Sequence, residues 1–278
     1  MRTHLMPALL RLCTGLAVAA ALPAQATVGG TGTNSFLAVG AYGVQVAPDW
    51  VLTANHVAGG FFPVSPPSTT DYSNGYGTRA VVDRFDAPGS GLFPANDVSL
   101  LRLAPTLAAV PYLLVSSDLY AVGAMPALNV TITNSGNQLP RGYAFTTVTE
   151  FADKIDPDDA GPSGLVTVNY LLSYDSLVHV EGGDSGGGLF LGHVFDAISP
   201  LLGLNSARLE DANKVPLGSG FVIPAAYRSW IDSTLSSALN NTQQIQWVSS
   251  VPEPGTWLLW AAGLAVLTAV ARKRTGPQ

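Results

Sequence analysis

Three short segments carry side chains that could together perform nucleophilic chemistry. His56 follows a strand-like apolar run, Asp97 directly precedes another, and Ser185 lies in a glycine-rich run. Each has a structural interpretation of its own: a histidine at a strand end, an aspartate in a turn, and a glycine-rich turn between strands. The neighbouring glycines have no side chains, so a nucleophilic hydroxyl at Ser185 would be accessible to a substrate. The backbone N–H groups of Gly183 and Ser185 could then converge on a developing oxyanion.

The elements that must position these residues are short strands. Apolar runs are brief, several alternate with polar residues or are rich in valine, and Gly, Pro, Asn, Asp and Ser separate them. This pattern, without the spacing of βαβ units, predicts antiparallel barrels or a sandwich. One helix is predicted near the end, opened by a proline and apolar along one face. The predicted strands lie within 36–47, 50–54, 79–85, 98–103, 128–133 and 164–172, and the helix within 224–239.

Composition excludes several classes of protein. The chain has 278 residues and a net charge of −6, and 12% of its residues are charged, against roughly 25% in an ordinary soluble domain. It also holds 29 glycines and 20 prolines. These values exclude a coiled coil, a highly charged disordered chain and a basic nucleic-acid binder.

The first 26 residues have the layout of a secretory signal peptide. The segment begins with the positive charges of Arg2 and Arg11, continues with an apolar run, and ends at Ala24-Gln25-Ala26, which has the small-x-small pattern of a cleavage site. A first transmembrane helix is the alternative, but the unbroken apolar stretch is short for a span. Cleavage would make Thr27 the mature N-terminus. It would also remove Cys13, the only cysteine, so the mature protein would fold without disulfides.

The C-terminal segment 251–278 has three parts in a fixed order. Val251-Pro252-Glu253-Pro254 is followed by the uncharged stretch 255–271 and then by Arg272-Lys273-Arg274. This order resembles the PEP-CTERM sorting signal, which implies an exosortase-type sorting enzyme as a partner. The apolar stretch predicts a single membrane-spanning helix with its basic end in the cytoplasm; a buried core helix is the alternative.

The three segments around His56, Asp97 and Ser185 together resemble the motifs of the trypsin/chymotrypsin-like serine proteases. They read Trp-Val-Leu-Thr-Ala-Asn-His, Asn-Asp-Val-Ser-Leu-Leu-Arg-Leu and Gly-Asp-Ser-Gly-Gly, and they follow that family's His–Asp–Ser order. The segment 220–235, which reads Gly-Phe-Val-Ile-Pro-Ala-Ala-Tyr-Arg-Ser-Trp-Ile-Asp-Ser-Thr-Leu, also resembles the closing strand and C-terminal helix of that fold. The resemblance implies an all-β protein of two antiparallel β-barrels, 27–116 and 117–240, with a C-terminal α-helix. A linker, 241–250, would lead to the sorting signal.

The resemblance also implies roles for individual residues. Ser185 would be the nucleophile, His56 the general base and Asp97 the group that orients His56. Gly183 and Ser185 would form the oxyanion hole. The start Thr27-Val28-Gly29-Gly30 resembles the freed N-terminus of active family members, so the Thr27 amine would pair with Asp184; a flexible leader is the alternative.

Three further residues map to the family's primary specificity pocket. By motif counting, His179 would lie at its base, Ser206 in its wall and Arg208 near its mouth. They would favour an acidic or polar substrate side chain, unless His179 and Arg208 are solvated loop residues. The acidic run 153–159 is interpreted as a solvated loop, with a calcium loop as the alternative.

The sequence therefore predicts an exported serine endopeptidase with no cofactor, no metal and no nucleic-acid partner. Its substrate would be a protein or peptide. It would be anchored in the inner membrane in transit and would then reach the cell surface, the extracellular matrix or the medium. A catalytically silent surface or matrix-binding relative and an esterase with the same triad are the alternatives.

Overall fold

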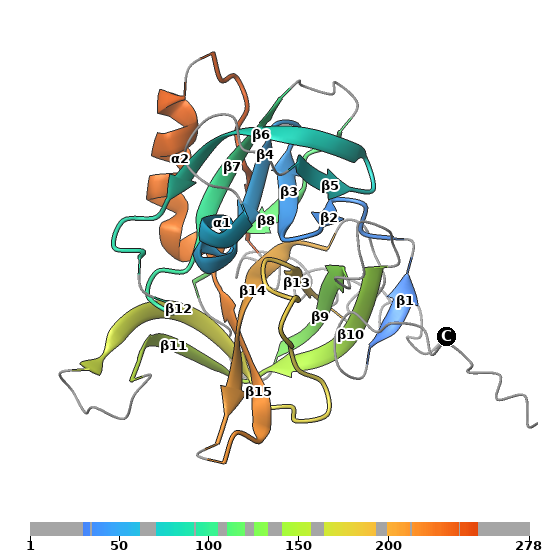
Figure 1. Cartoon of the computed structure of the whole chain (residues 1–278), viewed down its shortest axis with the longest axis vertical. Helices are drawn as coiled ribbons and strands as arrows, with labels where there is room; N and C mark the ends of the chain where they lie inside the picture. The colour runs from blue at the N-terminus through green and yellow to red at the C-terminus, as the bar shows by residue number, and fades with distance from the viewer. Residues whose placement is uncertain are drawn as a thin grey trace, which may run out of the picture.

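The computed structural model describes residues 30–33, 35–61, 71–91, 93–104, 110–119, 125–132, 141–156, 164–192, 199–211, 213–238 and 240–249. Figure 1 shows two β-sheets, with the smaller in its upper half and the larger below. The predicted signal peptide, Thr27 and the sorting segment 251–278 lie outside the described residues.

The smaller sheet is antiparallel and follows the order β2-β3-β4-β7-β6-β5. Its central strands are buried along nearly their whole length because they are built from apolar and β-branched residues. The strands are β2 (Val39–Gly40), β3 (Gly43–Ala47), β4 (Trp50–Thr53), β5 (Asp71–Asn74), β6 (Gly77–Asp86) and β7 (Ser99–Ala104).

The larger sheet has ten strands among the described residues, eight of them in the order β1-β10-β9-β13-β14-β15-β12-β11. These pair antiparallel, whereas β8 runs parallel to both β14 and β16. Bulges interrupt β14 against both of its antiparallel neighbours, which increases its local twist. The strands are β1 (Thr31–Thr33), β8 (Leu114–Ser116), β9 (Met125–Ile132), β10 (Arg141–Val148), β11 (Glu150–Ile155), β12 (Val166–Ser173), β13 (Gly188–Leu191), β14 (Leu201–Glu210), β15 (Pro216–Val222) and β16 (Gln246–Val248).

Three short helices complete the described structure: α1 (Asn55–Phe61), the 3-10 helix η2 (Pro224–Tyr227) and α2 (Arg228–Ser237). Pro224 opens η2, where its fixed φ and missing N–H cost nothing. Ile231 and Leu235 form the buried face of α2, as the apolar spacing predicts. The prediction of an all-β protein with a C-terminal helix is therefore confirmed.

One apolar core joins the two sheets. It includes Trp50 and Leu100 of the smaller sheet, Phe190 and Tyr170 of the larger sheet, and Ile231 of α2. Full burial of a large apolar side chain contributes about 1.5–3 kcal/mol, so this shared core holds the sheets in a fixed relation. Residues from both sheets can therefore form one site.

None of the helices in the described ranges is long and apolar enough to cross a bilayer. The stretch 255–271, for which the sequence predicts a membrane span, falls outside those ranges.

Candidate active site

His56 lies in the first turn of α1, directly after the buried strand β4. Its backbone N–H donates to Oδ1 of Asp97 over 2.8 Å, and its Nδ1 lies 2.8 Å from Oδ2 of the same carboxylate. A carboxylate only accepts hydrogen bonds, so Nδ1 carries a proton and Nε2 is the ring nitrogen left for proton transfer with a substrate. The His56 side chain is 31% exposed and that of Asp97 only 2%. The buried Asp97 carboxylate therefore fixes the orientation of the His56 ring, whose Nε2 is left without a bond to Asp97.

A chain of hydrogen bonds continues from Asp97 into the interior. The Ser206 hydroxyl donates to Oδ2 of Asp97 over 2.5 Å, and the Tyr170 hydroxyl lies 2.6 Å from the same Ser206 oxygen. Because Ser206 must use its proton on the carboxylate, Tyr170 must donate to Ser206. Burial, reinforced by the charge of Asp97, raises the pKa of Tyr170, which keeps its proton in place. The direction of every bond from Tyr170 to His56 is thus determined.

Ser185 lies in a tight turn between β12 and β13. Gly183 and Gly186 have φ values of 106° and 83°, which only glycine adopts without strain. Asn205 of β14 holds the end of this turn: its carbonyl accepts from the Gly186 N–H over 2.9 Å, and its N–H donates to the Gly187 carbonyl over 2.8 Å. The turn that carries Ser185 is therefore fixed to the residue that precedes Ser206.

The same turn packs against the smaller sheet, next to the strand that leads to His56. A Cβ atom at Gly186 would lie 2.5 Å from the carbonyl oxygen of Tyr42 and 3.0 Å from Oγ1 of Thr53, and the Thr53 hydroxyl donates to that same carbonyl. Within the described structure no hydrogen bond joins the His56 ring to the Ser185 hydroxyl. In unliganded sites such bonds are often long and tighten only when substrate binds.

Asp184, directly before Ser185, is a buried carboxyl group with a total exposure of 6%. It accepts hydrogen bonds from the Glu181 N–H over 2.8 Å and from the Thr131 hydroxyl over 3.1 Å. Burial outweighs these bonds and raises its pKa to about 7. Thr27, the residue predicted to pair with it, lies outside the described residues.

The structure brings His179 and Arg208 together on one carboxylate. Oε1 of Glu181 lies 2.9 Å from Nε2 of His179, and Oε2 accepts from Nη1 of Arg208 over 2.5 Å. Although desolvation opposes ionisation, the hydrogen bonds from Arg208 and His179 lower the pKa of Glu181. Arg208 also pairs with Glu210, and Lys214 lies 3.6 Å from Glu210. Two carboxylates of the chain, Glu181 and Glu210, therefore already pair with the positive charge of Arg208.

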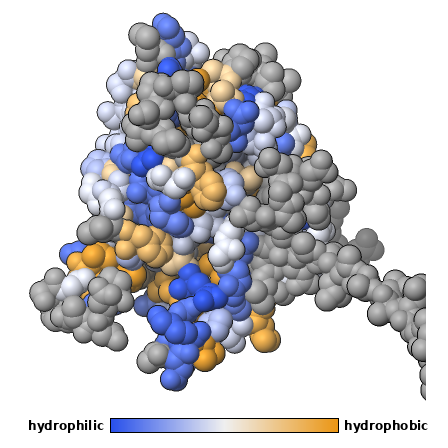
Figure 2. Space-filling view, viewed as in Figure 1, coloured by the Kyte–Doolittle hydropathy of each residue, from blue (hydrophilic) through white to orange (hydrophobic). Residues whose placement is uncertain are grey.

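The β14–β15 hairpin carries part of this charged group to the surface. Figure 2 shows hydrophilic side chains at the lower end of the molecule, where Figure 1 places the hairpin. Its residues Arg208 and Glu210 form an ion pair there.

Sequence reasoning missed several residues that shape this site. Asn205 and Tyr170 act through contacts between strands far apart in sequence, which no local pattern reveals. Phe93 packs its ring edgewise against His56, with the ring centroids 4.8 Å apart, although Phe93 is 54% exposed. Its only sequence signal was its position four residues before Asp97. Among the described residues, no three His, Cys, Asp or Glu side chains form a group that could hold a metal ion.

Comparisons with known proteins show which families the chain matches. A family model described as Trypsin matches residues 16–231, and a second model, described as PEP-CTERM protein-sorting motif, matches residues 250–274. No curated protein matches the sequence. Many solved structures match, among them one described as "Kallikrein-related peptidase 10 complex with Zn2+". That likeness has a TM-score of 0.45 and 21% identity, and covers 70% of this chain and 89% of the other.

Proposed function

The chain belongs to the trypsin family and carries a PEP-CTERM sorting signal, and from that premise we propose that it is an exported serine endopeptidase. The observation that carries the proposal is the buried Asp97 carboxylate, which holds both the backbone N–H and Nδ1 of His56. A silent binding protein would have no need of this arrangement. We propose that residues 27–116 and 117–240 form the two barrels, with the site between them. Two strands at the ends of the first range, β1 and β8, pair with the larger sheet.

The proposed reaction is acyl transfer to water through an acyl-enzyme. The Ser185 hydroxyl attacks a peptide carbonyl, Nε2 of His56 accepts the proton and later gives it to the leaving amine, and Asp97 stabilises the imidazolium. The N–H groups of Gly183 and Ser185 stabilise the tetrahedral oxyanion, and each contributes about 3 kcal/mol. Water then repeats the sequence and frees the carboxylic acid product and Ser185.

The N-terminus and the sorting signal suggest how the enzyme matures. A signal peptide of residues 1–26 would be removed on export, and the new amine of Thr27 would pair with Asp184. The buried and unusually basic Asp184 carboxyl group supports this pairing, because a cation at that place would favour its ionised form. The sorting signal implies export to the cell envelope or surface. We propose a membrane-spanning helix at 255–271 and processing there by an exosortase-type enzyme.

The ion pairs of Arg208 beside the Ser185 turn suggest which substrate side chain the enzyme prefers. Since Glu181 neutralises Arg208 and also binds His179, we propose that the primary pocket formed by His179, Ser206 and Arg208 takes polar, uncharged side chains. An acidic side chain would have to displace Glu181 from both partners.

Cleavage of an unfolded protein substrate tests the proposal. Protein purified from an exporting host should hydrolyse denatured casein, and the Ser185→Ala and His56→Ala variants should each lose at least about 10³-fold in kcat. Hydrolysis of small esters without any cleavage of protein would favour the esterase alternative. Equal cleavage by wild type and Ser185→Ala would contradict the assignment of Ser185.

A further inference from the structure

Residues 240–249 lie between the parts of the chain that the two family models match, which end at residue 231 and begin again at residue 250. The sequence predicts a linker here, because the stretch is polar. In the structure it contains the strand β16 and packs along the folded body. Three sets of contacts join residues 240–249 to the smaller sheet, to the larger sheet, and to α2 with the core.

The first set joins this segment to the smaller sheet. The Asp49 N–H donates to Oε1 of Gln243 over 2.9 Å, and Nε2 of Gln243 donates back to Oδ2 of Asp49 over 2.6 Å. Nε1 of Trp50 donates to Oδ1 of Asn241 over 3.0 Å. Asp49 and Trp50 stand at the start of β4, and the other end of β4 leads directly into α1 and His56.

The second set joins it to the larger sheet. β16 runs parallel to β8, with Trp247 opposite Val115, and the N–H of Ser117 donates to the carbonyl of Val248 over 2.7 Å. β8 lies in the chain between the last strand of the smaller sheet and β9, and its other neighbour is β14. β14 carries Ser206 and holds the turn of Ser185.

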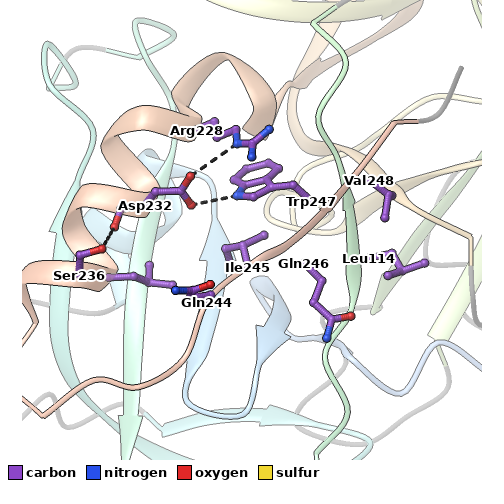
Figure 3. A pocket seen from close by; sticks show the side chains of 10 residues that line it. Leu114, Arg228, Asp232, Ser236, Gln244, Ile245, Gln246, Trp247 and Val248 are labelled. Carbon is purple, nitrogen blue, oxygen red and sulfur yellow. Dashed lines mark hydrogen bonds and ion pairs between the residues drawn. The ribbon is translucent and has the colours of Figure 1, made fainter. Parts of the chain in front are cut away.

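The third set joins it to α2 and the core. Nε1 of Trp247 donates to Oδ1 of Asp232 over 2.9 Å, and the Arg228 guanidinium lies 5.2 Å from the centre of the Trp247 ring. Figure 3 shows the indole beside both side chains, with Ile245 two residues earlier in the segment. Ile245 is buried in the shared core. The segment is thus held by apolar burial as well as by hydrogen bonds.

We infer that residues 240–249 form a clasp that ties the two sheets together and thereby positions His56 relative to Ser185. The clasp contacts the start of the strand that leads to His56 and, through β8, the strand that holds the Ser185 turn. It does this in a chain whose only cysteine is Cys13, so no disulfide between its two halves can do the same. The effect on catalysis rests on the proposed function, whereas the structural effect does not.

Two neighbouring glutamines offer a matched test. Gln243 makes both bonds to Asp49, whereas the adjacent Gln244 is exposed. In the full chain, the Gln243→Ala variant should react at least about five-fold more slowly with a fluorophosphonate probe at Ser185, at a temperature where circular dichroism shows every variant folded. The Gln244→Ala variant should react at the wild-type rate.

Exchanging the acidic and amide side chains at positions 243 and 49 distinguishes a positioning role of this contact from a general loss of structure. The Gln243→Glu variant places a second carboxylate against Asp49 and should also react slowly. Adding Asp49→Asn restores a donor opposite the new carboxylate and should return the rate toward that of wild type.

Equal probe rates for Gln243→Ala, Gln244→Ala and wild type would overturn the positioning role. If wild type itself does not react, the proposed function fails, and the positioning role fails with it. Thermal unfolding then tests whether residues 240–249 tie the two sheets together. In that case Gln243→Ala must lower the midpoint temperature of unfolding more than Gln244→Ala does. Equal midpoints would overturn the clasp as well.

Discussion

At the scale of single residues, Asp184 is the most unusual group: a buried carboxyl with no cationic partner among the described residues. Burial raises its pKa to about 7, from about 3.9 in an unfolded chain. The folded state therefore binds this proton more tightly than the unfolded state does, so stability falls as the pH rises through this range. A buried amine at the carboxylate would remove that loss.

The pairing of Thr27 with Asp184 can be tested through this pH dependence. A form with extra residues before Thr27 should lose up to about 4 kcal/mol of unfolding free energy between pH 4 and pH 8, at about 1.4 kcal/mol per unit of pKa difference. The form with a free Thr27 should lose less, and Asp184→Asn should make the two forms alike. Chemical denaturation at several pH values measures this; identical pH dependence of the two forms would argue for a flexible leader.

Tyr170 orients the proton of Ser206, which in turn bonds to Asp97. The Tyr170→Phe variant leaves the Ser206 hydroxyl free to turn, so we expect kcat to fall about ten-fold with KM nearly unchanged. Tyr72→Phe is the control, because Tyr72 is equally buried but its one hydroxyl proton is shared between the carbonyl oxygens of Ala38 and Gly43, 3.1 and 3.0 Å away. Steady-state kinetics on a peptide substrate compare them. The relay is refuted if both variants keep the wild-type kcat.

At the scale of elements, the Ser185 turn depends on how closely it approaches the smaller sheet. The Gly186→Ala variant would press a methyl group to 2.5 Å from the Tyr42 carbonyl oxygen at a φ of 83°, so the turn must move. A misplacement of about 1 Å can cost about 10²-fold in rate, and we expect a loss of that order in kcat/KM.

Gly182 supplies the control, since a Cβ atom there meets nothing within 4 Å. The Gly182→Ala variant should keep the folded structure and most of the activity. Comparable losses in both variants would show that the close approach of Gly186 is not what matters.

The ion pairs between the Ser185 turn and β14 determine the expected specificity. Glu181→Gln removes one of the two carboxylates that pair with Arg208 and leaves only Glu210, so an acidic substrate side chain should gain at least about ten-fold in kcat/KM relative to a neutral one. Cleavage of a peptide library that varies the residue before the scissile bond measures this ratio. An unchanged profile would place Glu181 outside the substrate site.

The sequence predicted most strands, because their apolar runs and separating turns are local signals. Strands β4, β6, β7, β9 and β12 overlap the predicted runs. It did not predict α1, because a seven-residue helix that includes Gly59 and Gly60 has weak helical propensity and depends on packing. It also missed β16, whose parallel pairing with β8 is a tertiary contact. Residue types and order indicated His56, Asp97 and Ser185, whereas Asn205 and Tyr170 could emerge only from strand pairing.

At the scale of the whole molecule, a trypsin-family domain and a PEP-CTERM motif are joined by the clasp. The shared core and residues 240–249 contact both sheets, which carry the residues of the proposed site. Every other proposed role depends on the Ser185 hydroxyl acting as an activated nucleophile.

Mass spectrometry of the protein after reaction with a fluorophosphonate probe shows whether Ser185 is activated. We predict a single adduct on Ser185, absent from Ser185→Ala and at least about 10³-fold slower in His56→Ala. If a folded wild-type protein with its N-terminus at Thr27 forms no adduct, or forms one elsewhere, Ser185 is not the activated nucleophile.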